Sequence, residues 1–300
     1  MSPFRLDLTA WVLRRRLRNE IDVWDEDTSR YQRSLVLEHG PVFVSVSQSG
    51  STEESTIRAE VFGDLASEST LSEITAALTR NLGLHRDLSG FMKSASRDPD
   101  LGPIAKRMRG VKPPRFASVF EALVNGVACQ QLSLDVGIHL LNRLARKYGL
   151  PVPGVEGAPP TFPGPEELAG IEPEEIRGLG FSFAKARTIV EASRAIVTGE
   201  LDLEGLTDLE DEFAYRELTA VRGVGRWTAE YVLLRGLGRI HVFPGDDVGA
   251  HNKLKSLMGL EPELTYDRVQ GLVARWEPYA GLVYFHLLLD SIDREWGLGL

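Results

Sequence analysis

The sequence is short of cysteine, of long apolar runs and of basic charge, and each shortage excludes a class of protein. Its single cysteine, Cys129, has no partner for a disulfide and cannot build an all-cysteine zinc or iron–sulfur site. The longest uncharged apolar stretch, from Pro278 to Leu289, is too short to cross a bilayer, and no secretory-type apolar segment opens the chain. A cytoplasmic protein without a membrane partner is therefore expected.

Common cofactor and nucleophile motifs are missing as well. None of the six histidines stands at metal-ligand spacing from a partner, and no phosphate-binding loop, nucleophile elbow or dinucleotide fingerprint occurs. The formal net charge of −9 disfavours a general nucleic-acid binder, because phosphate contacts usually come with a basic surface. Backbone amides and a few local cations can also hold phosphate, so the charge alone does not decide the question.

The first 90 residues have the pattern of a mixed α/β domain. Apolar and polar residues alternate over 42–46 and again over 57–61, which is typical of half-buried strands. The segment 33–37 is joined to the first of these through His39-Gly40-Pro41, which predicts a hairpin. Apolar residues at helical spacing then predict a helix over 71–82.

Beyond residue 90 the pattern becomes helical, with predicted helices over 116–127 and 185–197. Between Pro151 and Pro165 lie six prolines and three glycines, which indicate a long surface connection. The predicted fold class is α+β: an α/β domain over 1–90 followed by an all-α region over 91–300. Within that region we expect one helical subdomain over 113–237 and a second formed by 91–112 plus 238–300.

The most informative segment contains Gly223-Val224-Gly225 between two helical patterns. Two glycines separated by one residue allow positive φ and a tight turn. The free N–H groups and positive dipole of the second helix, over 227–235, would face outward from the turn, and this arrangement suits a phosphate. Taken alone, the same pattern also describes a plain turn between two helices.

Two aspartates follow a Pro-Gly break twenty residues after Trp227. Either Asp246 or Asp247 can cap the helix that follows, and without further context capping is the better interpretation for both. A carboxylate can also stabilise the positive charge that builds on a sugar when an N-glycosidic bond breaks, or orient the attacking water.

The chain resembles the helix-hairpin-helix (HhH-GPD) DNA glycosylases, in particular the bacterial DNA-3-methyladenine glycosylase II group. Besides the hairpin and the aspartates, the resemblance rests on Phe120-Glu121, on Gln130-Gln131-Leu132-Ser133 and on Trp276-Glu277-Pro278-Tyr279. It implies a TATA-binding-protein-like N-terminal domain and a glycosylase core that flips a damaged, alkylated base out of duplex DNA and excises it. A monomer without an organic cofactor is expected.

The resemblance also implies roles for single residues. Asp247 would be the catalytic carboxylate, which leaves capping to Asp246. Trp227 stands where strand-nicking relatives have a lysine, so a monofunctional glycosylase is expected. Gln131 would fill the gap left by the flipped base, although a polar helix end is an alternative for it.

Contacts to DNA, to a cation and to the base are implied in the same way. DNA contacts are expected from Gln130, Gln131, Gly223, Val224, Gly225, Arg226 and Thr228. The carbonyls of Thr219, Val221 and Val224 would hold Na⁺ or K⁺ when DNA is bound. The substrate pocket would be lined by Trp227, Tyr231, Leu288 and Leu289. The two leucines replace a Trp-Tyr pair of one branch, so Trp227 and Tyr231, on one helix face, would supply the aromatic surface unless they are plain core residues.

Two other functions stay open on the sequence. A non-catalytic protein that binds damaged duplex DNA agrees with the acidic charge, but it needs no carboxylate beside a polyanion. A glycosylase for deaminated or oxidised bases keeps the reaction and changes the substrate.

Overall fold

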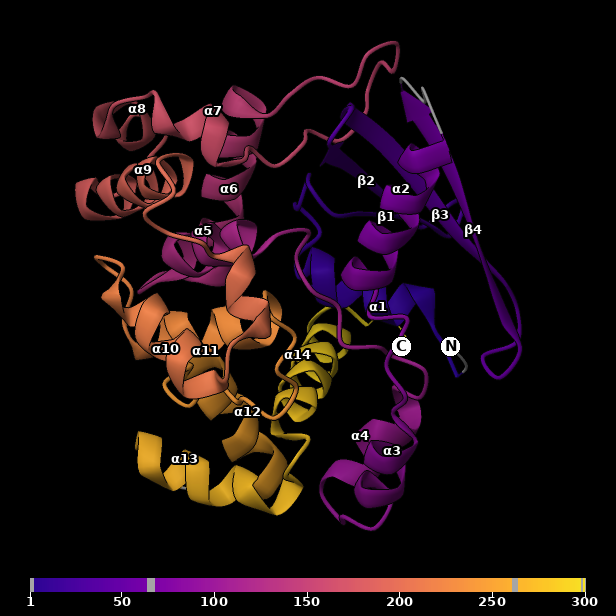
Figure 1. Ribbon diagram of the computed structural model, residues 1–300. Coiled ribbons are helices and arrows are strands. Elements are labelled where there is room, and N and C mark those ends of the chain that lie inside the picture. The colour runs from indigo at the N-terminus through magenta and orange to yellow at the C-terminus, as the bar shows by residue number, and fades with distance from the viewer. Residues whose placement is uncertain (1–2, 64–67, 261–263, 298, 300) are drawn as a thin grey trace.

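The computed structural model describes residues 3–63, 68–260, 264–297 and 299. Its N-terminal part holds an antiparallel sheet in the order β1-β2-β3-β4, with helices packed against it (Figure 1). The elements of this part are α1 (Leu6–Arg14), β1 (Val23–Asp25), β2 (Arg30–Leu37), β3 (Gly40–Gly50), β4 (Ser55–Gly63) and α2 (Glu68–Asn81). The predicted hairpin is confirmed, since β2 pairs with β3 and Leu37 lies opposite Gly40.

Strand alternation places one face of this sheet in a core of its own. Tyr31 and Leu35 of β2 and Val44 and Val46 of β3 are buried there, against apolar side chains of α1 and α2. Helix α1 was not predicted from the sequence; every residue in it except Asp7 is buried.

The rest of the described chain is helical, as the α+β prediction required. Its helices are α3 (Ser89–Ala95), α4 (Leu101–Arg107), α5 (Val119–Cys129), α6 (Leu134–Tyr148), α7 (Pro165–Ala169), α8 (Pro173–Arg177), α9 (Phe183–Val197), α10 (Asp211–Ala220), α11 (Arg226–Arg235), α12 (Val248–Met258), α13 (Tyr266–Val273) and α14 (Ala280–Trp296), with short 3₁₀ helices at Glu204–Asp208 and Ala274–Trp276. The proline-rich segment connects α6 to α7 without helix or strand. Among the described residues, none of the helices is both long and apolar enough to span a bilayer.

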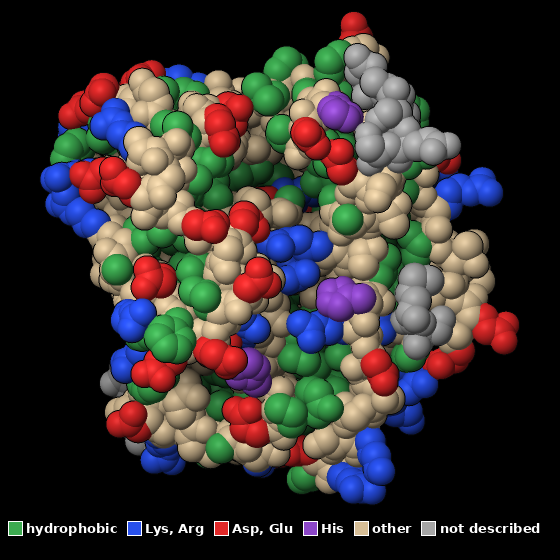
Figure 2. Space-filling model, viewed as in Figure 1, with side chains coloured by type: hydrophobic (Ala, Val, Ile, Leu, Met, Phe, Trp, Pro, Cys, Tyr) green, Lys and Arg blue, Asp and Glu red, His purple; other side chains and the backbone are tan. Residues whose placement is uncertain are grey.

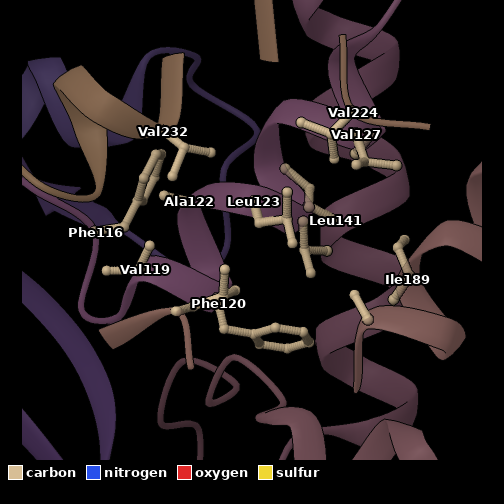
Figure 3. Close-up of a cluster of buried hydrophobic side chains, with 14 of the residues drawn as sticks. Phe116, Val119, Phe120, Ala122, Leu123, Val127, Leu141, Ile189, Val224 and Val232 are labelled. Atoms are coloured by element: carbon tan, nitrogen blue, oxygen red, sulfur yellow. The ribbon is translucent and has the colours of Figure 1, made fainter. Parts of the chain in front are cut away.

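These helices build two further cores, and the hairpin packs in the first of them. The first core joins α5, α6 and α9 to α11; Figure 3 shows Val224 of the hairpin packed beside Val127 of α5, with Leu141 and Ile189 nearby. The second joins α3 and α4 to α12, α13 and α14. Helix α1 lies inside the segment assigned to the N-terminal domain, yet its Trp11 packs in this second core.

A buried ionic network fastens the sheet to α5. Arg33 of β2 pairs with Asp22 at 2.7 Å and with Glu121 of α5 at 2.5 Å, and all three side chains are almost fully buried. The Tyr31 hydroxyl donates to the same Asp22 carboxylate at 2.7 Å. Charges buried in this way are tolerated only when they are paired. The network therefore fixes the N-terminal sheet against the helix that leads to Gln130 and Gln131.

Replacing Arg33 by methionine tests this network, because the change leaves two buried carboxylates without their cation. Arg33→Met should lower the free energy of unfolding by about 3–5 kcal/mol, measured by urea denaturation. Arg30→Met is the matched control: Arg30 lies on the same strand but forms a partly exposed ion pair with Glu60, and its loss should change stability little. Equal losses in the two variants would contradict the role given to the network.

Candidate active site

The Asp247 carboxylate joins three helices. Its Oδ1 accepts a hydrogen bond from the Ala250 amide at 2.7 Å, so Asp247 is the N-cap of α12. Its Oδ2 accepts from Trp227 Nε1 of α11 and from the Tyr284 hydroxyl of α14, both at 3.0 Å. Hydrogen bonds to an ionised acceptor are stronger than those between neutral groups, so the carboxylate is fixed in one orientation.

The assignment of capping to Asp246 is wrong. Only the residue directly before the first helical turn can accept from the free amides of that turn, and Asp247 holds this position. Asp246 instead forms an ion pair with Arg226 at 2.7 Å. The Arg226 guanidinium also lies 3.8 Å from the centre of the Tyr266 ring, so this candidate DNA contact is engaged within the protein.

Buried polar groups that sequence reasoning missed hold the loop before Asp247. Glu230 of α11 accepts from the Gly245 amide at 2.9 Å and from the Tyr266 hydroxyl at 2.7 Å. Burial raises the pKa of the Glu230 carboxyl. His251 Nε2 lies 2.6 Å from the Gly245 carbonyl, so this histidine contacts the same loop.

Asp247 faces an inner cavity of about 340 Å³ that also includes Trp227, Tyr231, Tyr284 and Leu288 in its lining. The Trp227 and Tyr231 rings stack at 5.4 Å with 27° between their planes, as their spacing on one helix face predicts. Burial, and then the nearby Asp247 charge, raise the pKa of Tyr284 well above its usual value, so its hydroxyl keeps the proton that it donates.

Leu288 and Leu289, both predicted to line the substrate pocket, lie in different surroundings. Leu288 lines the inner cavity, but Leu289 is fully buried in the core of the C-terminal helices and does not contribute to the lining. Consecutive residues on a helix point about 100° apart, so only one of the pair can face the cavity. Tyr284 could have been found from Leu288, because it lies four residues earlier on the same face of α14.

An outer cleft of about 790 Å³ adjoins the cavity and runs along the hairpin. Gln130, Gln131, Gly223, Gly225 and Asp246 are among the residues that line it. Trp227 and Asp247 line the cleft and the inner cavity alike, so they mark the passage from one to the other.

Only one hairpin glycine needs its conformational freedom. Gly223 has φ +80°, and a Cβ there would lie 2.2 Å from the Thr188 hydroxyl. Gly225 is extended (φ −95°, ψ −179°), so only Gly223 takes the positive φ that the sequence pattern allows. A Cβ at Gly225 would meet open space. The side chain of Val224 is buried, while its amide donates to the Val221 carbonyl at 3.0 Å.

The end of α5 is tied to the hairpin by side chains. Gln130 Nε2 donates to the Gly223 carbonyl and to the hydroxyl of buried Thr228, both at 2.9 Å. Lys185 Nζ donates to the carbonyl of Gln130 at 2.6 Å. Gln131 itself is exposed and has a left-handed backbone (φ 54°), which is uncommon for this residue type and directs attention to a functional role.

Among the described residues, no group of three or more histidine, cysteine, aspartate or glutamate side chains is placed to hold a metal ion. Burial raises the pKa of the Cys129 thiol, which opposes formation of a reactive thiolate.

Comparison with known proteins agrees with this arrangement. A family model described as HhH-GPD superfamily base excision DNA repair protein matches residues 124–278, more than half of the chain. The chain is 29% identical over 72% of its length to a DNA-3-methyladenine glycosylase of Bacillus subtilis, covering 71% of that protein. It is 27% identical over 62% of its length to DNA-3-methyladenine glycosylase 2 of Escherichia coli, covering 63% of it.

A solved structure of a 3-methyladenine DNA glycosylase from Archaeoglobus fulgidus is similar over 98% of this chain and 97% of that one, with a TM-score of 0.84 and 26% identity. The chain covers 58% of a putative DNA-3-methyladenine glycosylase of Bacillus subtilis, 71% of the Bacillus subtilis glycosylase described above and 51% of a probable bifunctional transcriptional activator/DNA repair enzyme of Mycobacterium tuberculosis.

The two hairpin glycines should respond differently to alanine. Gly223→Ala combines positive φ with a clash against Thr188, so it should lower the free energy of unfolding by about 2 kcal/mol. Gly225→Ala, at an extended and open position, should change it by less than about 0.5 kcal/mol. Urea denaturation of the two variants measures both, and similar losses would mean that the turn differs from the one described.

Proposed function

Because the chain belongs to the HhH-GPD superfamily of base-excision DNA repair proteins, we propose that it is a monofunctional DNA glycosylase that flips alkylated bases out of duplex DNA and hydrolyses their N-glycosidic bonds. One observation carries this proposal: the Asp247 carboxylate, held by three donors, stands where an open cleft meets an aromatic cavity. The relatives named DNA-3-methyladenine glycosylases support the same substrate class.

Asp247 would act on the sugar. As the glycosidic bond breaks, its electron pair goes to the base nitrogen and positive charge builds at C1′ of the deoxyribose. A fixed anion lowers the energy of that charge without having to reorganise. Water then adds to C1′ and loses a proton. A base alkylated on a ring nitrogen starts positively charged and leaves as a neutral molecule, so no dedicated general acid is required.

The inner cavity would receive the flipped base. The stacked pair of Trp227 and Tyr231 offers aromatic surface on one side, and Leu288 offers apolar surface. A base enclosed there is separated from bulk water, which strengthens the electrostatic effect of Asp247.

The hairpin would hold the DNA backbone. The net charge is −9, and Figure 2 shows acidic side chains among basic ones on the face in view. Phosphate would therefore be held by local groups and not by a broad basic surface. Helix α11 begins directly after Gly225, and the open space at this glycine lets a phosphate approach its free amides. Gln131, exposed at the cleft, would occupy the space left by the flipped base.

A monovalent cation fits the other side of the turn. Helix α10 ends at Ala220, so the Thr219 carbonyl belongs to its last turn, where carbonyl groups lack donors within the helix and attract positive charge. The Val221 and Val224 carbonyls follow in the turn. Na⁺ or K⁺ held by these oxygens would neutralise part of the charge of a bound phosphate.

The cytoplasmic location and the monomeric state also stay predictions.

Removing the charge of Asp247 tests the proposed chemistry. Asparagine is itself a good N-cap, but its amide nitrogen cannot accept the hydrogen bond that Trp227 Nε1 donates to Oδ2. Asp247→Asn should therefore fold with a loss of about 1–3 kcal/mol and still bind a lesion duplex. Base release from alkylated duplex DNA should fall by at least about a hundredfold, measured under single-turnover conditions.

Asp246→Asn is the matched control, because it removes only a partly exposed ion pair with Arg226. Its release rate should stay within a few-fold of the unaltered protein. Loss of turnover in Asp246→Asn with turnover kept in Asp247→Asn would reverse the assignment.

The products test the monofunctional assignment. The Trp227 indole is neither basic nor nucleophilic, so alkylated duplex should yield intact strands with abasic sites that break only in alkali or heat, and borohydride should trap no protein–DNA adduct. Lys253 is the residue to watch, because it lines the inner cavity and burial lowers the pKa of its ammonium group. A trapped adduct that disappears in Lys253→Ala would identify this lysine as a lyase amine and contradict the assignment.

A further inference from the structure

The backbone of Gln131 is held in a conformation that this residue type rarely adopts. Its φ of 54° lies in the left-handed region, which is strained for a residue that carries a side chain. The side chain is exposed and lines the outer cleft. An exposed side chain has no packing of its own to impose this backbone, so contacts on its neighbours have to supply it.

Lys185 of α9 supplies one of these contacts. Its Nζ donates to the Gln130 carbonyl at 2.6 Å and to the Ala128 carbonyl at 3.0 Å. The Gln130 carbonyl and the Gln131 amide belong to one planar peptide group, so fixing the oxygen also fixes the plane from which the φ of Gln131 is measured. Both carbonyls lie at the C-terminal end of α5, where backbone acceptors lack helical partners and attract a cation.

The side chain of Gln130 is a second anchor. Its Nε2 donates to the Gly223 carbonyl and to the Thr228 hydroxyl, both at 2.9 Å, and Thr228 is 1% exposed. The main chain of Gln130 is thus tied to α9 and its side chain to the hairpin. Gln131 follows directly, so these two anchors set its position relative to the hairpin.

Building on the proposed function, we infer that Lys185 is a positioning residue, which holds Gln131 ready to enter the duplex before DNA binds. A residue that is already in its bound conformation loses less conformational freedom when it fills the gap left by the flipped base. The flipped state of the damaged nucleotide is then more populated. Base release is faster as a result, although Lys185 takes no part in bond cleavage.

Replacing Lys185 by methionine keeps a side chain of similar length but removes the charge and both donors. Single-turnover release from alkylated duplex DNA should fall by at least about tenfold. A 2-aminopurine placed beside the lesion brightens when its neighbour leaves the stack, and this rise on binding should be smaller in Lys185→Met. Lys185→Arg, which keeps the charge and the donors, should restore most of both signals.

A double-mutant cycle shows whether Lys185 acts through Gln131. Gln131→Ala removes the inserting side chain and should itself slow release. Added to Gln131→Ala, the change Lys185→Met should lower the rate by no more than about twofold, because contacts that act through one side chain are not additive. Where Lys185→Met does not fold, Lys185→Gln takes its place in the cycle and must show the same dependence on Gln131.

Arg194→Met is the matched control. Arg194 lies on the same helix and likewise donates to two carbonyls, those of Ala169 and Ile171, at 2.9 and 2.8 Å, but it does not line the outer cleft. The release rate and the fluorescence signal should both stay unchanged in this variant.

Salt dependence separates positioning from a phosphate contact. Lys185 lines the outer cleft, and its Nζ carries a third hydrogen that a phosphate oxygen can accept. Because a positioning residue neutralises no phosphate, Lys185→Met should bind undamaged duplex with unchanged affinity and unchanged dependence on salt.

The two proposals fail differently. Additive losses in the cycle, or an unchanged release rate in folded Lys185→Met, would make Lys185 structural. Weaker binding to undamaged duplex with a shallower salt dependence would make it a phosphate contact. Either result overturns the inference while the glycosylase assignment stands. Release of no alkylated base by the unaltered protein would instead contradict the proposed function itself.

Discussion

The molecule depends on one carboxylate with three donors. Asp247 starts α12 through Oδ1 and holds α11 and α14 together through Oδ2. The hydrogen bonds that join these helices also orient the Asp247 carboxylate toward the cavity, so the same contacts serve the fold and the proposed chemistry. All three donors are uncharged groups, so among the described residues these bonds do not make the carboxylate half of an ion pair. That is the condition under which it can stabilise a developing cation.

The protein has a negative net charge, but basic side chains line its inner cavity. The net charge is −9, yet four cations line the inner cavity beside Asp247. In the proposed function, phosphate is held at the hairpin by amides and a helix dipole, which do not depend on net charge.

Sequence reasoning worked where the signal is local. Alternation gave the β2–β3 hairpin, and the spacing of four residues placed Trp227 and Tyr231 on one face. It failed to choose between adjacent residues, as with Asp246 and Asp247 or Leu288 and Leu289. A shift of one position along the helix changes which of the two faces the site, and the sequence pattern does not fix the helix boundary or its rotation that closely. It could not reach the contact of Lys185 with Gln130, which joins residues 55 positions apart in the chain. Such contacts follow from packing and leave no pattern in the sequence.

The most direct test of the central claim is a crystal structure of the Asp247→Asn protein bound to a duplex that contains an alkylated base. The account predicts the damaged base inside the cavity beside Trp227, C1′ of its sugar within about 3–3.5 Å of the side chain at position 247, and Gln131 inserted into the duplex. A base that remains stacked in the duplex, or one that is flipped into another part of the protein, would contradict it.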